Sequence, residues 1–554
     1  MKKNNILITL FLLFSSVLIY GQNNTDFLPY SYSNIIEGAV PFYLAPAHDF
    51  TEDIAQAELF EKQGNYPRIA RNFDLDLNMD NSGLWQELPN GDRLWRMGFK
   101  SKEALFTCLF FDKFFLPKGA TFHFYSPDQK QLSRTYTYED NQGNELFSTE
   151  FISGESCIIE YFEPAAVKGE GTLRLSSLAH QYRNLPMADD CEVNIACSEA
   201  INWLDEKRGV VRILVKEGAN TGYCSGSLIN NTALDCKRYI LTAFHCGVNA
   251  SAADLNQWKF YFNYEATQCT GQSDAFGITS NVFTGCTKKA DSNDNGGDTG
   301  SDFLLVQISS TSQPSWWSNV YWNGWNKVNT PPASGSVSIH HPSGDNKKFS
   351  QTTGVATSGS WGISGTHWKV HWGGTANGWG VTEPGSSGGP LFNLNGQIVG
   401  TLTGGNSFCN SIQPNGQNQP DAYGKFYFHW SLNGSAQNQK LSSWLDPLNS
   451  SVTSLNGSYN PCNFVGIDEA VAQVAATIFP NPTNGLINIS LSFINKNNID
   501  ITVYNVVGQK VAYKNIESAA ENLISLDLTN KVAGVYFIHI KTNDLEIVKN
   551  IIIL

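Results

Sequence analysis

The stretch Gly385-Ser386-Ser387-Gly388-Gly389-Pro390 places a serine in a glycine-rich turn directly before an apolar, strand-like run. Glycine adopts backbone angles that other residues avoid, so the amides of Gly385 and Ser387 can point toward one spot in such a turn. Two amide donors aimed at one position can stabilise the oxyanion of a tetrahedral intermediate. A Ser/Gly-rich loop without chemistry remains the alternative interpretation of this stretch by itself.

A histidine and an aspartate upstream could complete a catalytic group with Ser387. His245 follows the apolar run in Leu241-Thr-Ala-Phe-His-Cys246, and Asp302 directly precedes the apolar residues 303–308. A serine hydroxyl needs a neutral imidazole to accept its proton, and a carboxylate fixes the tautomer of that imidazole. The order His, Asp, Ser is that of chymotrypsin rather than that of subtilisin or the α/β-hydrolases. Taken singly, the two residues also fit a structural histidine and a turn aspartate.

The length, composition and net charge of the chain limit the kind of protein that carries these motifs. At 554 residues the chain exceeds what one hydrophobic core organises, so we expect two to four domains. With 41% hydrophobic and 16% charged residues, the composition is that of a globular protein. The net charge of -13 argues against non-specific binding of nucleic acid.

The first residues have the pattern of a secretory signal peptide, which we assign to residues 1–21. Lys2 and Lys3 precede an apolar run over residues 6–20, and a polar stretch follows. The run is short for a membrane span, although an uncleaved anchor helix is the alternative. We therefore expect the mature chain outside the cytoplasm. The eleven cysteines fit an oxidising compartment, and their odd number leaves at least one unpaired.

Strand-like runs and turn signals dominate the rest of the chain. We predict a β-rich domain over residues 22–185, where residues 121–125 form a typical strand run. Residues 186–448 continue with short strands at barrel-like spacing and a hairpin that turns at Asn395-Gly396. The expected strands of this part cover residues 210–215, 238–243, 259–264, 303–308 and 367–372, with one short helix near 440–445. A Ser/Asn/Gly-rich linker over residues 449–476 then leads to a small β-sandwich over residues 477–554.

From residue 191 to about 447 the chain resembles the bacterial lysyl endopeptidases of the trypsin-like superfamily. The shared boxes are Cys191-Glu-Val-Asn-Ile-Ala-Cys197, Gly226-Ser-Leu-Ile-Asn-Asn-Thr232, Leu-Thr-Ala-x-His-Cys, Ser301-Asp-Phe303, Ile339-His-His-Pro342, Val381-Thr-Glu-Pro-Gly-Ser-Ser-Gly388 and Asp421-Ala-Tyr-Gly424. The resemblance implies an all-β, chymotrypsin-like double β-barrel protease. In it His245 and Asp302 would come from the first barrel and Ser387 from the second, with Gly385 and Ser387 as the oxyanion hole.

The same resemblance implies where substrate specificity lies. An aspartate at the position of Asp421 would lie at the bottom of the pocket for the residue before the cleaved bond, where a buried carboxylate would pair with lysine or arginine. A simple turn aspartate is the alternative. Trp361 matches a tryptophan of the family's substrate site, whereas Thr403 stands where the family has a histidine. That departure leaves the choice between lysine and arginine open. Gly404 and Gly405 would be backbone partners of an extended substrate strand.

The resemblance further implies the disulfides Cys191 to Cys409, Cys197 to Cys269 and Cys224 to Cys246. For the remaining cysteines, we predict bonds between Cys236 and Cys286 and between Cys108 and Cys157. These assignments leave Cys462, in the expected linker, as the odd thiol. Spacing alone does not assign connectivity.

No metal or organic cofactor is expected. The aspartate-rich residues 290–298 suggest calcium, but they lack the spacing and the terminal glutamate of an EF-hand, so we expect a solvated loop. No group of cysteines and histidines has a convincing zinc spacing.

The two flanking units have different expected roles. Residues 477–554 resemble the type IX secretion sorting domain of gram-negative bacteria through Phe479-Pro-Asn-Pro-Thr-Asn-Gly485, Tyr504-Asn-Val-Val-Gly-Gln-Lys510 and Gly534-Val-Tyr-Phe537. That resemblance implies export across the outer membrane, followed by removal or by surface attachment. A carbohydrate-binding module is the alternative. We interpret the N-terminal unit as a propeptide that blocks the protease or assists its folding, and expect cleavage between residues 169 and 190.

Together these observations predict a secreted serine endopeptidase that cleaves after lysine, with arginine left open, through an acyl-enzyme on Ser387. We expect a monomer whose partners are protein or peptide substrates and the type IX secretion machinery, and which binds no nucleic acid. The competing hypothesis is a surface adhesin or binding protein that keeps the protease fold without catalysis.

Overall fold

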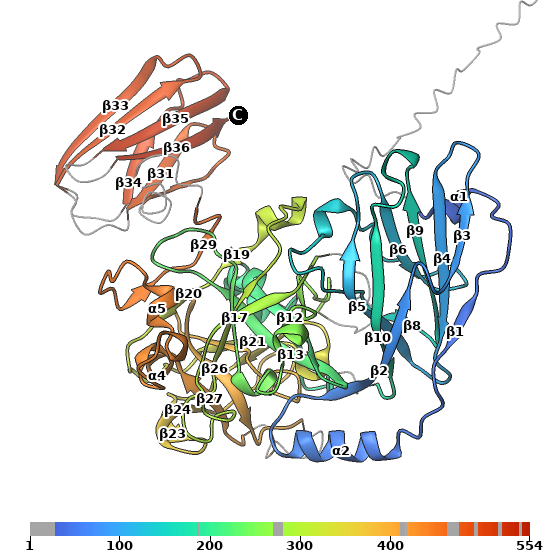
Figure 1. The fold of residues 1–554 in the computed structure, drawn as a ribbon. Helices are drawn as coiled ribbons and strands as arrows, with labels where there is room; N and C mark the ends of the chain where they lie inside the picture. The colour runs from blue at the N-terminus through green and yellow to red at the C-terminus, as the bar shows by residue number, and fades with distance from the viewer. Residues whose placement is uncertain are drawn as a thin grey trace, which may run out of the picture.

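The structure is a computed structural model. It describes residues 28–184, 188–269, 281–409, 416, 418–462, 476–491, 497–518, 523–541 and 546–554. Within these residues the chain consists almost entirely of β-strands with a few short helices, which confirms the all-β prediction (Figure 1). The expected signal peptide lies outside the described residues.

The N-terminal domain is built from two sheets that pack face to face. The first contains β1 (Phe42–Leu44), β3 (Leu84–Glu87), β4 (Arg93–Lys100), β6 (Thr121–Tyr125) and β9 (Ser156–Glu163). The second contains β2 (Arg68–Asn78), β5 (Phe106–Phe115), β7 (Phe147–Ser148), β8 (Ile152–Ser153) and β10 (Thr172–Gln181). Alternation along the strands turns large aromatic side chains inward, including Trp95, Phe111 and Phe122, and these form a common core. Two helices, α1 (Tyr30–Ser33) and α2 (Thr51–Lys62), flank the sheets.

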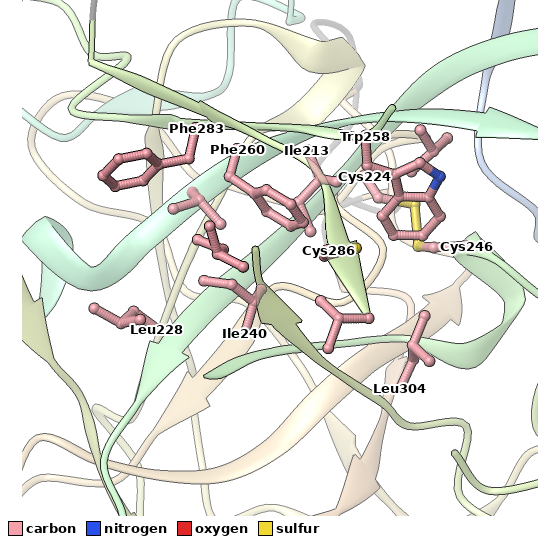
Figure 2. Close-up of a cluster of buried hydrophobic side chains, with 14 of the residues drawn as sticks. Ile213, Cys224, Leu228, Ile240, Cys246, Trp258, Phe260, Phe283, Cys286 and Leu304 are labelled. Carbon is pink, nitrogen blue, oxygen red and sulfur yellow. A yellow bond between two sulfur atoms is a disulfide. The ribbon is translucent and has the colours of Figure 1, made fainter. Parts of the chain in front are cut away.

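The first barrel follows in the chain. Its strands are β12 (Val210–Glu217), β13 (Asn220–Ile229), β14 (Tyr239–Thr242), β15 (Lys259–Phe262), β16 (Val282–Thr284), β17 (Cys286–Asp291) and β18 (Leu304–Ile308), with helix α3 (Ala252–Leu255). Figure 2 shows its apolar core, in which the disulfide of Cys224 and Cys246 lies beside Trp258. This disulfide joins β13 to the turn that carries His245 and so fixes that turn on the barrel.

The second barrel is a separate ten-stranded sheet. Its strands are β11 (Val193–Asn194), β20 (Gly324–Asn326), β21 (Val337–His340), β22 (Lys348–Gln351), β23 (Thr357–Ser360), β24 (Ser364–Val370), β25 (Pro390–Phe392), β26 (Gln397–Gly405), β27 (Asp421–Lys425) and β28 (Ser454–Leu455). The expected hairpin is the pair β25 and β26, with Gly396 in the left-handed region at its turn. Helices α4 (Phe426–Ser431) and α5 (Ser442–Leu445) follow β27, the latter within the expected helical stretch.

One strand of the N-terminal domain continues into the first barrel. β2 pairs antiparallel with β13, with Arg71 opposite Asn220 and Ala70 opposite Thr221, while its other edge pairs with β10. The two domains therefore share one twelve-stranded sheet, and Figure 1 shows β2 reaching from the N-terminal domain to β13.

The first half of the expected linker is ordered on the barrels. β28 pairs with β20, and β29 (Ser458–Tyr459) pairs with β19 (Tyr321–Trp322). Cys462, expected to be the odd thiol, forms a disulfide with Cys236. The Ser/Asn/Gly-rich composition concealed these strands because their stabilisation comes from backbone hydrogen bonds to edge strands rather than from apolar side chains.

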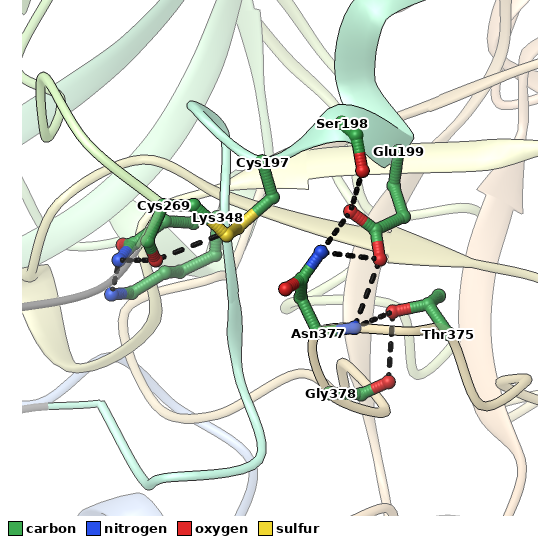
Figure 3. The surroundings of a disulfide bond; sticks show 9 residues. Cys197, Ser198, Glu199, Cys269, Lys348, Thr375, Asn377 and Gly378 are labelled. Atoms are coloured by element: carbon green, nitrogen blue, oxygen red, sulfur yellow. Dashed lines mark hydrogen bonds between the residues drawn. A yellow bond between two sulfur atoms is a disulfide. The ribbon is translucent and has the colours of Figure 1, made fainter.

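The disulfides divide into expected and unexpected ones. The three pairings that the resemblance implies are present. The predicted bonds between Cys236 and Cys286 and between Cys108 and Cys157 are wrong, since Cys108, Cys157 and Cys286 are buried free thiols. Figure 3 shows the bond of Cys197 and Cys269, next to the contact of Glu199 with Asn377 on the second barrel.

The C-terminal unit is a small sandwich of two sheets around a core of isoleucine, leucine and valine side chains. One sheet contains β30 (Ala476–Phe479), β31 (Leu486–Leu491) and β34 (Leu523–Asp527). The other contains β32 (Asn497–Asn505), β33 (Lys510–Ser518), β35 (Gly534–Lys541) and β36 (Glu546–Ile553).

Candidate active site

His245 and Asp302 form a buried, doubly hydrogen-bonded pair in the first barrel. His245 lies in a short turn after β14, and Asp302 lies two residues before β18, which pairs with β14. His245 Nδ1 is 2.7 Å from Asp302 Oδ2, and the His245 backbone N–H donates to Asp302 Oδ1 at 2.9 Å. The imidazole holds the pKa of Asp302 below its usual value although burial opposes this. The pair therefore has the geometry in which a carboxylate fixes the tautomer of an imidazole.

The other imidazole nitrogen is unoccupied. His245 Nε2 is buried and has no hydrogen-bond partner in the part of the chain that the structure describes, so it makes no hydrogen bond with Ser387. Ser387 lies close by, because its carbonyl is 3.9 Å from the sulfur of Cys246, the residue after His245. Loose contacts between serine and histidine are common in sites without substrate.

The loop before β25 presents two unused amide donors. Within the described residues, the N–H groups of Gly385 and Ser387 have no hydrogen-bond acceptor. The carbonyls of the same two peptide units, Pro384 O and Ser386 O, each accept a backbone hydrogen bond, at 2.7 and 2.8 Å. Because the N–H and C=O of a trans peptide point in opposite directions, both N–H groups face away from these contacts. The arrangement suits the binding of an oxyanion.

Gly385 is required by its surroundings. Its φ is +101°, and a Cβ at this position would lie 2.8 Å from the backbone nitrogen of Gly344. Any other residue would thus strain the loop and push it away from Gly344.

Asp421 lies on β27, fully buried, with its carboxylate surrounded by donors. Oδ2 accepts from Trp372 Nε1 at 2.6 Å, Thr382 Oγ1 at 2.7 Å and Ser407 Oγ at 2.6 Å, whereas among the described residues Oδ1 accepts only from Ser407 N at 3.0 Å. Burial raises the pKa of Asp421, and these hydrogen bonds oppose the rise. Asp421 is therefore not a simple turn residue. A Cβ at Gly405 would lie 1.8 Å from Oδ1, so a glycine is needed beside it.

Trp361 and Thr403 lie together, with a histidine that sequence reasoning missed. A Cβ at Gly404 would lie 3.0 Å from the Trp361 ring, which shows that the indole covers this glycine. His367 on β24 bonds Thr403 Oγ1 through Nε2 at 2.9 Å, and its ring centroid is 6.5 Å from that of Trp361. Its pKa is lowered to about 4, mainly by burial, so the ring is neutral. The strand run over residues 367–372 was the only signal for it, and that run does not say which neighbour the side chain meets.

The aspartate-rich loop is not the solvated loop that we expected. Asp291, Ser292 and Asp294 are buried, and only Asn293, Asn295, Asp298 and Thr299 are exposed. Burial arises because the loop folds against Asp302, whose backbone N–H donates to Asp294 Oδ2 at 2.7 Å.

Two family models match separate parts of the chain. Residues 185–424 match the sequence model of the family described as lysyl endopeptidase, C-terminal domain. The match covers 240 of the 554 residues, and we call these residues the lysyl endopeptidase domain after it. Residues 477–554 match the secretion system C-terminal sorting domain. The sorting domain marks the chain as a secreted protein, either released or held at the cell surface. Among the described helices none is long and apolar enough to cross a membrane.

Individual relatives of the lysyl endopeptidase domain are distant. A lysyl endopeptidase of Pseudomonas aeruginosa is 27% identical over 297 residues, which cover 49% of this chain and 59% of that protein. The chain thus spans about three-fifths of this relative. Among solved structures, the protease Anisep of Arthrobacter nicotinovorans is 17% identical, with a TM-score of 0.29 over 39% of this chain and 90% of that one. A thermostable serine protease, AL20, from an extremophilic microorganism is 16% identical, with a TM-score of 0.27 over 40% and 92%.

A segment of the N-terminal domain contacts the lysyl endopeptidase domain on both barrels. A Cβ at Gly64 would lie 3.0 Å from the Trp361 ring, and one at Gly222 on β13 would lie 2.1 Å from Pro67 O. Between them Tyr66 is fully buried in the core of the first barrel, and its hydroxyl donates to Glu217 at 2.9 Å. No sequence motif indicated this contact.

The lysyl endopeptidase domain has one group of side chains near enough to share a metal ion in the described ranges: Asp189, Glu383 and Cys409. The sulfur of Cys409 is bonded to Cys191, which leaves only two carboxylates. Two carboxylates are fewer protein ligands than a structural metal site uses.

Proposed function

We propose that the protein is a secreted serine endopeptidase. The observation that carries the proposal is the His245–Asp302 pair, with His245 Nε2 left open near a loop whose Gly385 and Ser387 amides have no acceptor among the described residues. A nucleophile, a base and two oxyanion donors are the parts that acyl transfer requires.

The reaction would proceed in two acyl-transfer steps. Ser387 Oγ attacks the carbonyl carbon of the peptide bond while His245 Nε2 takes its proton, and the oxyanion is held by the amides of Gly385 and Ser387. The imidazolium then gives its proton to the leaving amine. Water attacks the acyl-enzyme with the same histidine as base, which releases the acid and restores the serine. Because His245 acts as a base only when neutral, activity should fall on acidification.

We assign specificity for lysine, with arginine left open, to Asp421. Its Oδ1 accepts one hydrogen bond from the residues that the structure describes and so retains lone pairs for an ammonium or guanidinium group, whereas Oδ2 already has three donors. Asp421→Asn should abolish the preference for a basic residue and leave folding intact. If this variant keeps the preference for a basic residue, Asp421 does not determine the specificity.

The N-terminal domain would act as a propeptide that keeps the enzyme latent. The residues from Gly64 to Arg68 contact Trp361, one of the expected substrate residues, and Gly222 on the first barrel. A segment in this position competes with an extended substrate for the same surfaces. N-terminal sequencing of the secreted enzyme should find a start between residues 169 and 190.

The sorting domain would pass the chain to the type IX secretion machinery. Deletion of residues 477–554 should therefore leave the protein inside the cell envelope, as judged by immunoblotting of the culture medium and cell fractions.

One assay separates the endopeptidase from a non-catalytic adhesin of the same fold. Processed wild-type protein and Ser387→Ala are compared on peptides that contain a single lysine or arginine. The proposal expects cleavage after the basic residue by the wild type and a loss of at least about a thousandfold in the variant. Equal cleavage rates for wild type and Ser387→Ala would contradict the endopeptidase proposal and favour the adhesin hypothesis.

A further inference from the structure

Asp294 lies directly behind the catalytic pair. It belongs to the aspartate-rich loop before β18, and it is only 2% exposed. Its Oδ2 accepts the backbone N–H of Asp302 at 2.7 Å. Its Oδ1 accepts Ser292 Oγ at 2.6 Å and Gly297 N–H at 3.1 Å. Every contact of this carboxylate is thus an acceptor contact.

This donor set requires a carboxylate. Two of the donors, the N–H groups of Asp302 and Gly297, are fixed backbone groups on opposite oxygens of Asp294. An asparagine in this place would have to turn its NH₂ group toward one of them, because an amide has only one acceptor oxygen. A buried donor that faces another donor is destabilising.

The backbone of Asp302 needs such a support. Its φ is +58°, in the left-handed region, which is unfavourable for a residue other than glycine. In this conformation both carboxylate oxygens of Asp302 reach His245. The hydrogen bond from Asp302 N–H to Asp294 holds the residue there.

The same loop contacts the neighbouring site residues through its glycines. A Cβ at Gly296 would lie 2.9 Å from the Cβ of His245, and one at Gly297 would lie 3.1 Å from Trp361 and 3.3 Å from the Cβ of Asp302. Asp294 accepts the N–H of Gly297, so its carboxylate joins Asp302 to the loop that packs against Trp361.

We propose that Asp294 is a positioning residue of the catalytic site, which holds Asp302 in its left-handed conformation and places a second negative charge behind the His245–Asp302 pair. The inference rests on the proposed endopeptidase function. In the reaction, Asp294 would neither give nor take a proton. Its charge would favour the protonated state of His245 that forms when Ser387 loses its proton.

The other titratable groups that the structure describes around the pair do not supply this charge. His367 and His429 face Asp302 from β24 and α4, and burial lowers their pKa values to about 4 and 3, so both are neutral at the pH of activity. Asp291, on the same loop, is paired with Lys288 at 2.8 Å.

The test is Asp294→Asn in the full chain, assayed after processing. We expect kcat to fall about ten- to a hundredfold with KM changed less than about twofold. We also expect the acidic limb of the kcat/KM profile to move to lower pH by about half a unit or more, because a negative charge that favours protonated His245 has been removed. The matched control is Asp298→Asn, an exposed aspartate of the same loop, which should change neither quantity.

A lower kcat with an unchanged acidic limb of the kcat/KM profile would overturn the proposal, because a loosened loop without any effect of charge gives the same result. Unchanged kcat would overturn it as well. If Asp294→Asn does not fold, Asp294→Ser is used, because it is smaller, uncharged and able to accept the Asp302 N–H.

A second readout does not depend on turnover. The protonation of the His245 imidazole is followed by NMR in Ser387→Ala and in Ser387→Ala/Asp294→Asn, and the double variant should titrate at lower pH. If wild-type protein cleaves no peptide, the endopeptidase function fails while this titration still decides whether Asp294 acts on His245. Identical titration curves would refute the positioning role.

Discussion

His367 Nε2 lies 2.9 Å from Thr403 Oγ1. Thr403 stands where the resemblance to the lysyl endopeptidases predicts a histidine. The threonine there binds a histidine from another strand instead. The imidazole lies between Thr403 and Thr366, whose hydroxyl is 2.7 Å from Nδ1. The neutral imidazole near Trp361 therefore comes from β24, whereas β26 carries Thr403 at this place.

Replacement of His367 by phenylalanine should destabilise the protein at neutral pH. Thr403 Oγ1 is almost fully buried and would lose its partner, at a cost of about 2 kcal/mol. Urea denaturation at pH 7.5 measures the free energy of unfolding. His371→Phe, at an exposed histidine on the adjoining segment, should change it by less than about 0.5 kcal/mol.

The difference between wild type and His367→Phe should shrink in acid. The folded-state pKa of His367 is lowered to about 4, so below the unfolded-state value of 6.5 the unfolded chain takes up a proton that the folded chain does not. Wild-type protein thus loses up to about 3 kcal/mol as the pH falls from 6.5 to 4, and the variant is spared this loss. Denaturation curves at several pH values check this. A difference that is constant with pH would contradict the assignment of a neutral, buried His367.

Gly405→Ala should impair both catalysis and folding stability, because the new Cβ would lie 1.8 Å from Asp421 Oδ1 and 2.6 Å from the Asp421 Cα. The new methyl group would overlap Asp421 Oδ1, and the carboxylate would have to move by about 1 Å or more to relieve the overlap, a displacement worth about a hundredfold in rate. Measurement of kcat/KM on a lysine peptide, together with a thermal melt, separates the two effects. Gly143→Ala serves as control because no atom of the described residues beyond its chain neighbours would lie within 4 Å of its Cβ.

The cysteines should behave as four bonds and three protected thiols. Of the eleven cysteines, Cys108, Cys157 and Cys286 are free and buried, and burial raises the pKa of each thiol. A thiol reagent should label none of the three thiols in native protein, because the thiolate is the reactive form and burial disfavours it. In denaturant without reductant the reagent should label all three. Peptide mapping without reduction should find Cys236 linked to Cys462. A peptide that links Cys236 to Cys286 would contradict the structure.

Tyr66→Ala should weaken latency in the unprocessed chain. Tyr66 is fully buried in the first barrel, and its loss removes both an aromatic anchor and the hydrogen bond to Glu217. The initial rate of lysine-peptide cleavage by precursor, before any processing, should rise above that of the wild-type precursor. Tyr138→Ala, at a partly exposed tyrosine of the same domain, should leave that rate unchanged. Equal initial rates for all three precursors would mean that Tyr66 does not hold the inhibitory segment in place.

Sequence patterns identified the candidate catalytic residues but not the residues that hold them in position. His245, Asp302 and Ser387 stand in short contiguous boxes, so their chemistry can be recognised without the fold. Asp294 could not be recognised, because a buried aspartate in a polar loop has the same local sequence as a solvated one. The pairing of β2 with β13 was equally hidden, since alternation predicts a strand and its buried face but not its partner.

The shared sheet would also make cleavage and activation two separate events in the proposed endopeptidase. A cut between residues 169 and 190 breaks one covalent bond, yet β2 would keep its backbone hydrogen bonds to β13, and Tyr66 would stay in the barrel. The cleaved product would therefore be a tight complex of two fragments rather than a free protease. Activity would appear at the rate at which the N-terminal fragment dissociates or is digested, so that dilution and time outside the cell, rather than the first cut, would determine when proteolysis starts.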